Sequence, residues 1–86
     1  MTLPEKFADA QKRVKTLTSA PSNDTLLQLY ALYKQGTEGD AHGKRPGMLD
    51  IKGRAKFDAW TSKRGLTRDA AQESYVALTD RLLAGK

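Results

Sequence analysis

Apolar residues recur at helical spacing in four segments of this 86-residue chain, and glycine or proline separates the segments. The first segment carries them three or four residues apart, at Leu3, Phe7, Ala10, Val14 and Leu17. The chain has only three valine or isoleucine residues, whereas strands favour β-branched side chains. These features predict an all-α fold of four helices in a single domain, residues 1–86.

Capping residues predict where each helix begins. Thr2 with Glu5 reads as a capping box, Ser22 or Asn23 caps the second helix, Asp50 the third and Thr67 the fourth. The expected helices run from Thr2 to Ala20–Pro21, from about 24 to 38, from about 51 to 64, and from Thr67 onward. The segment 39–49 holds three glycines and a proline, so we expect a loop.

The second helix carries an apolar stripe that is expected to face the core. Its members are Leu26, Leu29 or Tyr30, and Tyr33, with Leu27 beside them. Tyr30 and Lys34 lie about 40° apart on a helix, so two phenols and one ammonium share a face. Such a face suits a ligand that is partly apolar and partly anionic. The plainer alternative is core tyrosines with a solvated lysine.

Positive charge is concentrated in one part of the chain. The net charge is +5, and residues 44–68 hold eight basic residues against two acidic ones. This asymmetry points to an anionic partner. Lys52 and Lys56 share the third helix's face at i, i+4 spacing and could hold a phosphate, although an ordinary solvated basic helix has the same pattern.

Several functional classes lack support in the sequence. There is no cysteine, so disulfides and thiolate metal ligands are excluded, and His42 alone does not make a usual zinc site. Asp50 and Asp58 read as a cap and a salt-bridge partner, and no nucleophile motif or phosphate loop occurs. We therefore expect a non-enzymatic protein without a metal or cofactor. Because the sequence has no secretory signal and no apolar span, we also expect it to be a soluble protein of the cytoplasm.

Two stretches of the sequence resemble a known protein family. Residues 21–35 (PSNDTLLQLYALYKQ) and 45–60 (RPGMLDIKGRAKFDAW) closely resemble the acyl-CoA-binding protein family, and weaker similarity extends from Phe7 to about Leu83. The resemblance implies a four-helix up-down-down-up bundle that binds long-chain fatty acyl-CoA as a carrier and pool buffer. It also implies a monomer that makes at most transient contact with a membrane or an enzyme, with no membrane insertion.

The resemblance also assigns candidate ligand residues. Those expected to contact the nucleotide and phosphates are Lys15, Tyr30, Tyr33, Lys34, Lys52, Lys56 and Tyr75. Leu26 and Leu27 are expected to line the path of the acyl chain. Under this interpretation the lysines neutralise phosphate charge, the tyrosines pack on the nucleotide, and burial of methylene groups rewards a long tail.

Three positions depart from the family's usual residues. Gly36 is expected to loosen the end of the second helix by roughly 0.5–1 kcal/mol, Phe57 replaces a common tryptophan, and Gln11 replaces a small residue. The alternative function is a basic helical module that binds nucleic acid or an acidic protein partner, although no nucleic acid is expected here.

Overall fold

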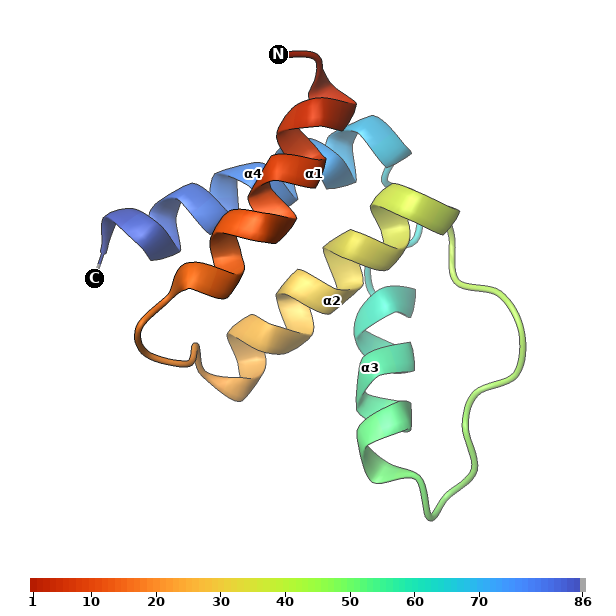
Figure 1. Cartoon of the computed structure of the whole chain (residues 1–86). Helices are drawn as coiled ribbons and strands as arrows, with labels where there is room; N and C mark the ends of the chain where they lie inside the picture. Colours follow the sequence, from red (N-terminus) through yellow and green to blue (C-terminus); the bar gives the residue numbers. More distant parts are fainter. Residues whose placement is uncertain (86) are drawn as a thin grey trace.

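The computed structural model describes residues 1–85, and Lys86 lies outside the described part. The helices are α1 (Leu3–Arg13), α2 (Asn23–Glu38), α3 (Ile51–Thr61) and α4 (Arg68–Ala84), with a short 3-10 helix, η1 (Val14–Thr16), after α1. In Figure 1, α2 and α3 run one way while α1 and α4 run the opposite way. The predicted all-α, up-down-down-up bundle is confirmed.

All four predicted caps are present. The Thr2 hydroxyl accepts a hydrogen bond from Glu5 N–H, and the Glu5 carboxylate accepts one from Thr2 N–H at 3.2 Å, which completes the capping box. Ser22, Asp50 and Thr67 each accept from the backbone N–H three residues later, at 3.2, 3.0 and 3.0 Å. These bonds satisfy N–H groups that have no partner inside the helix.

Two helix ends differ from the prediction. The first helix stops at Arg13 and tightens into η1, and α3 ends at Thr61 rather than near residue 64. After Thr61 the chain forms turns with bonds three residues back, and Gly65 takes a positive φ of 96°. The Gly65 N–H donates to Asp40 Oδ1 at 2.9 Å, so a residue 25 positions earlier helps to shape this ending.

The core lies between α1, α2 and α4. Its buried members are Phe7, Ala10, Leu29, Leu32, Ala71 and Tyr75. The Phe7 and Tyr75 rings meet edge to face with centroids 5.2 Å apart, which is a favourable aromatic geometry. The predicted stripe on α2 is wrong in part, because Leu26 is 45% exposed and Tyr33 is 39% exposed. Neighbouring helices contact α2 on two sides, and its buried face includes Leu29, one of the two residues predicted for that position, and Leu32, which was not predicted.

Gly36 has a packing role that the sequence did not indicate. A Cβ at this position would lie 3.0 Å from Gln72 Cγ and 3.3 Å from Phe7 Cζ, closer than ordinary contact. The Gly36 carbonyl also accepts a hydrogen bond from Gln72 Nε2 at 2.9 Å. The missing side chain therefore lets α2 approach α4 and the Phe7 ring closely. This close packing offsets the destabilisation that glycine causes inside a helix.

Helix α3 packs on α2 and stands apart from α1 and α4. The 39–50 loop runs beside it and is tied down by Arg45, whose Nε and Nη2 donate to Asp58 at 2.9 and 2.7 Å, and by Trp60 Nε1, which donates to Gly39 O at 2.8 Å. The predicted pairing of Asp58 is thereby confirmed. Over residues 1–85, no helix is both long and apolar enough to cross a membrane.

The Asp40 carboxylate joins α2 to the turn between α3 and α4, and its charge makes this contact dependent on pH. Its Oδ1 accepts from Gly65 N–H and from Gln35 Nε2, and these bonds, the backbone one first, hold its pKa below the ordinary value. A lowered folded-state pKa adds stability at neutral pH, and that stability is lost as the pH falls through the folded-state pKa.

We therefore expect Asp40→Ala to lower the melting temperature at neutral pH, and the deficit to narrow between about pH 5 and pH 2 as the wild-type carboxylate protonates. Thermal unfolding followed by circular dichroism across that range tests this. Glu73→Ala, on the exposed surface of α4, is the matched acidic control. A deficit that stays constant with pH would contradict the electrostatic role of Asp40.

Candidate functional site

A groove opens between the first halves of α2 and α3. Its volume is about 450 Å³, and its lining residues come equally from the two helices: Asn23, Leu26, Leu27, Tyr30, Ile51, Lys52, Ala55 and Lys56. The apolar side chains that line the groove on both helices are left exposed or only partly buried. The size is within the range of small-molecule binding clefts.

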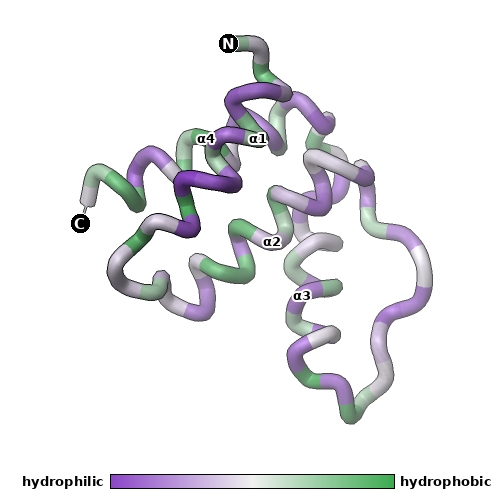
Figure 2. Tube along the Cα trace, in the orientation of Figure 1, coloured by the Kyte–Doolittle hydropathy of each residue, from purple (hydrophilic) through white to green (hydrophobic). Residues whose placement is uncertain are grey.

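The groove combines apolar walls with positive charge. Leu26, Leu27, Ile51 and Ala55 supply the apolar surface, and Ile51 is 77% exposed. The loop immediately before α3 adds exposed apolar side chains, including Leu49 at 99% exposure, and Figure 2 shows this hydrophobic tip at the lower end of α3. Exposed apolar surface beside lysines fits a ligand with an apolar part and an anionic part.

Tyr30 and Lys56 face each other across the groove. The Lys56 ammonium lies 5.5 Å from the centroid of the Tyr30 ring. One turn further along both helices, Lys34 of α2 lies 4.8 Å from the centroid of the Trp60 ring of α3. Each helix therefore places one lysine against an aromatic ring of the other. Cation–π attraction holds these ammonium groups near the cleft without neutralising their charge.

Lys34 has an additional partner on its own helix. Its ammonium forms an ion pair with the Glu38 carboxylate one turn later, and this bond is the main cause that raises the pKa of Lys34. The other Glu38 oxygen lies 3.4 Å from His42 Nε2. The His42 ring stands edge-on to Trp60 with centroids 5.3 Å apart. His42 itself is well exposed.

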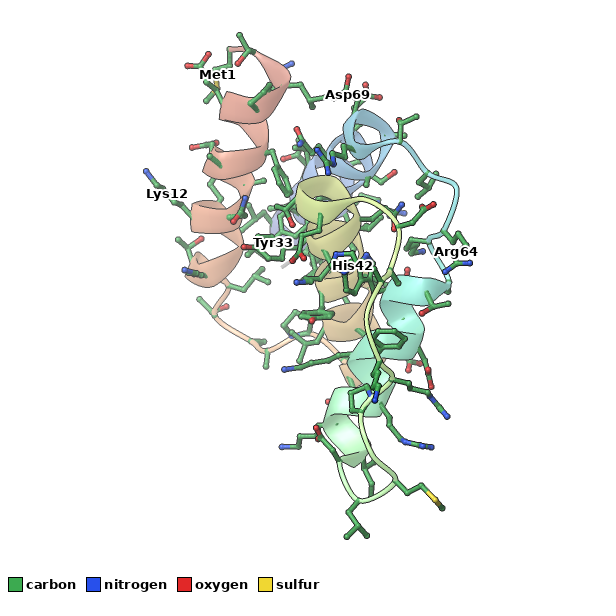
Figure 3. All side chains as sticks on the ribbon, turned by 90° about the vertical axis from the view of Figure 1, so that its right-hand side faces the viewer. Met1, Lys12, Tyr33, His42, Arg64 and Asp69 are labelled. Carbon is green, nitrogen blue, oxygen red and sulfur yellow. The ribbon has the colours of Figure 1, made fainter. Side chains whose placement is uncertain are left out.

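The two remaining candidate tyrosines belong to an aromatic cluster centred on Phe7. The Tyr33 ring lies 6.2 Å from the Phe7 ring, which in turn contacts Tyr75. Tyr75 is only 6% exposed, and burial raises the pKa of its phenol. Figure 3 shows Tyr33 between α1 and α2, and His42 on the other side of α2, toward the loop that follows this helix. Tyr33 therefore connects the exposed surface near Lys34 with the core.

Comparison with known proteins identifies the family. A family model described as acyl-CoA-binding protein matches residues 4–79. The chain belongs to the acyl-CoA-binding protein family. It is 57% identical over 84 residues to acyl-CoA-binding protein homolog 1 of Caenorhabditis elegans, covering 98% of this chain and 95% of that protein. It is 44% identical over 78 residues to the acyl-CoA-binding protein of Saccharomyces cerevisiae, covering 91% of this chain and 90% of that protein.

Solved structures of the family have the same fold. The crystal structure of Oryza sativa acyl-CoA-binding protein 2 superposes with a TM-score of 0.94 at 37% identity, covering 98% of this chain and 93% of that one. The solution structure of the acyl-CoA-binding protein of Babesia bovis has a TM-score of 0.80 at 40% identity, with 99% and 97% covered. The bundle expected from the family resemblance is the bundle observed.

The structure brings only some of the candidate residues together. Those that line the groove are Leu26, Leu27, Tyr30, Lys52 and Lys56. Lys34 and Tyr33 lie about one turn further along α2, and Tyr75 is part of the core behind them. Lys15 lies in η1, exposed, and is not among the groove-lining residues. The site roles of all these residues stay predictions.

Sequence reasoning missed four residues of this region: Asn23, Ile51, Ala55 and Trp60. A signal for three of them was present. Ile51 and Ala55 repeat at i, i+4 beside Lys52 and Lys56, and Trp60 continues the Lys52–Lys56 row. In residues 1–85, no cluster of three or more histidine or acidic side chains is arranged to hold a metal ion.

Proposed function

We propose that this chain binds long-chain fatty acyl-CoA thioesters in the α2–α3 groove, with the acyl chain against Leu26 and Leu27 and the phosphates near Lys34, Lys52 and Lys56. One observation supports the proposal most directly. A groove of about 450 Å³ combines apolar walls with two lysines that no acidic side chain in the described residues neutralises, Lys52 and Lys56. An anionic head attached to an apolar tail matches both features.

The tyrosines have distinct places in this proposal. Tyr30 lines the groove and presents its ring beside Lys56, so it can stack on adenine next to a phosphate. Tyr33 presents an exposed edge near Lys34, where its hydroxyl can donate a hydrogen bond to the head group. Tyr75 lies behind Phe7 and contributes mainly by positioning that cluster. Lys15 is exposed on η1, and its ammonium is proposed as a further contact for the head group.

Titration with palmitoyl-CoA, followed by calorimetry, is the direct test. We expect one-to-one binding that is tighter than the binding of free CoA, because each buried methylene contributes about 0.8 kcal/mol. At ligand concentrations about 100 times Kd, the free energy of unfolding should rise by roughly 2.7 kcal/mol. Trp60 fluorescence gives an independent signal, since the Lys34 ammonium lies against its ring. Equal affinity for free CoA and palmitoyl-CoA would contradict the acyl site.

We also propose that the bound thioester is shielded and not cleaved, so that the chain acts as a carrier and buffer of its ligand. The groove lining contains no histidine, serine or acidic residue that could serve as a nucleophile or general base. Incubation of the complex with a reagent that reacts with free thiols measures the rate at which CoA is released from the thioester. Release of free CoA no faster than from palmitoyl-CoA in buffer is the expected result, and faster release would indicate catalysis.

The setting of this activity is proposed as the cytoplasm, with the chain as a monomer that makes transient contact with membranes or enzymes. The exposed apolar tip at Met48, Leu49 and Ile51 supports such a contact, because it adjoins the groove. The alternative of a basic module for nucleic acid or an acidic protein has less support. Two of the clustered cations, Arg45 and Arg54, donate to Asp58 and to Pro46 O within the protein itself.

A further inference from the structure

The three lysines of the proposed site differ in their ion pairing. In the part of the chain that the structure describes, Lys52 and Lys56 pair with no acidic side chain, whereas Lys34 is paired with Glu38. The pair is partly sheltered: the Lys34 side chain is 21% exposed and that of Glu38 is 39% exposed. Glu38 is the last residue of α2, one turn beyond Lys34.

Glu38 is held in place from several directions. His42 Nε2 lies 3.4 Å from its Oε1, while Oε2 accepts the Lys34 hydrogen bond. Arg68 reaches the backbone at the same point, with Nη2 donating to the Glu38 carbonyl at 3.4 Å. The Lys34 bond is the main cause that lowers the pKa of Glu38, so the carboxylate is fully charged at neutral pH. The Glu38 carboxylate is therefore already paired with the Lys34 ammonium, to which a phosphate of the ligand is proposed to bind.

We propose that Glu38 is an internal competitor for the anionic head group and that it sets how much Lys34 adds to ligand affinity. This inference rests on the proposed function. A phosphate that takes Lys34 from Glu38 must replace an existing ion pair. A phosphate that shares the ammonium, which has three donors, must sit close to a second negative charge. Both routes reduce the gain from Lys34 and leave Lys52 and Lys56 as the stronger anchors.

Glu38→Gln tests the competition, because it removes the charge and keeps the shape. Removing the charge of an exposed or half-exposed ion-pair partner corresponds to a factor of up to about five in Kd. We expect Glu38→Gln to lower the Kd for free CoA and the Kd for palmitoyl-CoA by about two- to fivefold. The factor should be the same for the two ligands, because the effect lies in the head group that they share.

Two further variants isolate the role of Lys34. Glu73→Gln makes the same change on the exposed face of α4, away from the groove, and should leave both affinities unchanged. Lys34→Met keeps most of the aliphatic stem and removes the ammonium. In the Lys34→Met background, Glu38→Gln should no longer tighten binding, since there is no cation left to release. This double-mutant cycle separates competition at Lys34 from a general reduction in negative charge.

A ligand-free readout accompanies the titrations. Because the Glu38 bond raises the pKa of Lys34, Glu38→Gln should lower that pKa toward its ordinary value, which NMR of the lysine side chain measures. If Glu38→Gln binds the two ligands as tightly as the wild-type protein or more weakly, the inference is overturned. The proposed function still stands in that case, provided that the wild-type protein binds palmitoyl-CoA. Equal tightening with and without Lys34 would also overturn it. Failure of the wild-type protein to bind palmitoyl-CoA would overturn the proposed function as well.

Discussion

Replacing Lys56 by methionine is expected to weaken palmitoyl-CoA binding about ten- to a hundredfold and to leave the fold intact. A hydrogen bond to a charged group contributes about 1.5–3 kcal/mol, and each 1.4 kcal/mol is a factor of ten in Kd. Lys56 lines the groove and its ammonium is held over the Tyr30 ring, so it is already positioned beside the proposed nucleotide site. Methionine keeps much of the apolar stem and removes the charge.

Lys44→Met is the matched control, because Lys44 is an exposed residue of the same basic segment that does not line the groove. It changes the net charge by the same amount, so it measures the general electrostatic attraction for an anionic ligand. We expect less than a twofold change in Kd for this control at physiological salt, where exposed distant charges are screened. The result that would assign Lys56 a structural role is a lower melting temperature with unchanged ligand affinity.

Phe7→Ala is expected to cost about 3–5 kcal/mol of unfolding free energy, the usual range for removing a buried phenylalanine. Phe7 is 5% exposed, meets Tyr75 edge to face and lies against Gly36. Truncation would leave a cavity between α1, α2 and α4 that no neighbouring side chain fills without moving. The total free energy of unfolding of a small domain is roughly 5–15 kcal/mol, so this loss is a large share of the stability.

Urea denaturation followed by circular dichroism measures this loss. Phe7→Leu keeps an apolar side chain of intermediate size, so it should be destabilised less and provides a folded variant if Phe7→Ala unfolds. Leu49→Ala is the control: its side chain is 99% exposed, and we expect a change within about 0.5 kcal/mol. A small effect of both Phe7 variants would show that the aromatic cluster is not the centre of the core.

The starts of the helices could be predicted because each is decided by neighbours in the chain. The hydroxyl or carboxylate of Thr2, Ser22, Asp50 or Thr67 reaches an N–H three residues later without help from the rest of the fold. The end of α3 was predicted too late because it depends on a distant contact. Asp40 accepts from the Gly65 backbone, and such a bond leaves no periodic signal near residue 61.

The candidate site shows the same division. The resemblance to the family and the i, i+4 spacing identified Tyr30, Lys34, Lys52 and Lys56 as a set of residues able to hold an anionic, partly apolar ligand. The spacing did not show that Leu26 and Tyr33 are exposed, since it had assigned both to the core. Nor did it show that Glu38 pairs with Lys34, although the pair is also at i, i+4 spacing.

By itself, the sequence determined the helical class, the four capped starts, the concentration of positive charge and the family. These depend on residue type and local spacing, which the order of residues states directly. Only the tertiary structure decided which helical faces meet. Periodicity tells which residues share a face, but the face that becomes core and the face that becomes groove depend on how α2 packs between α3 and α4. That packing places Lys56 against Tyr30, Lys34 against Trp60, and Gly36 against Phe7.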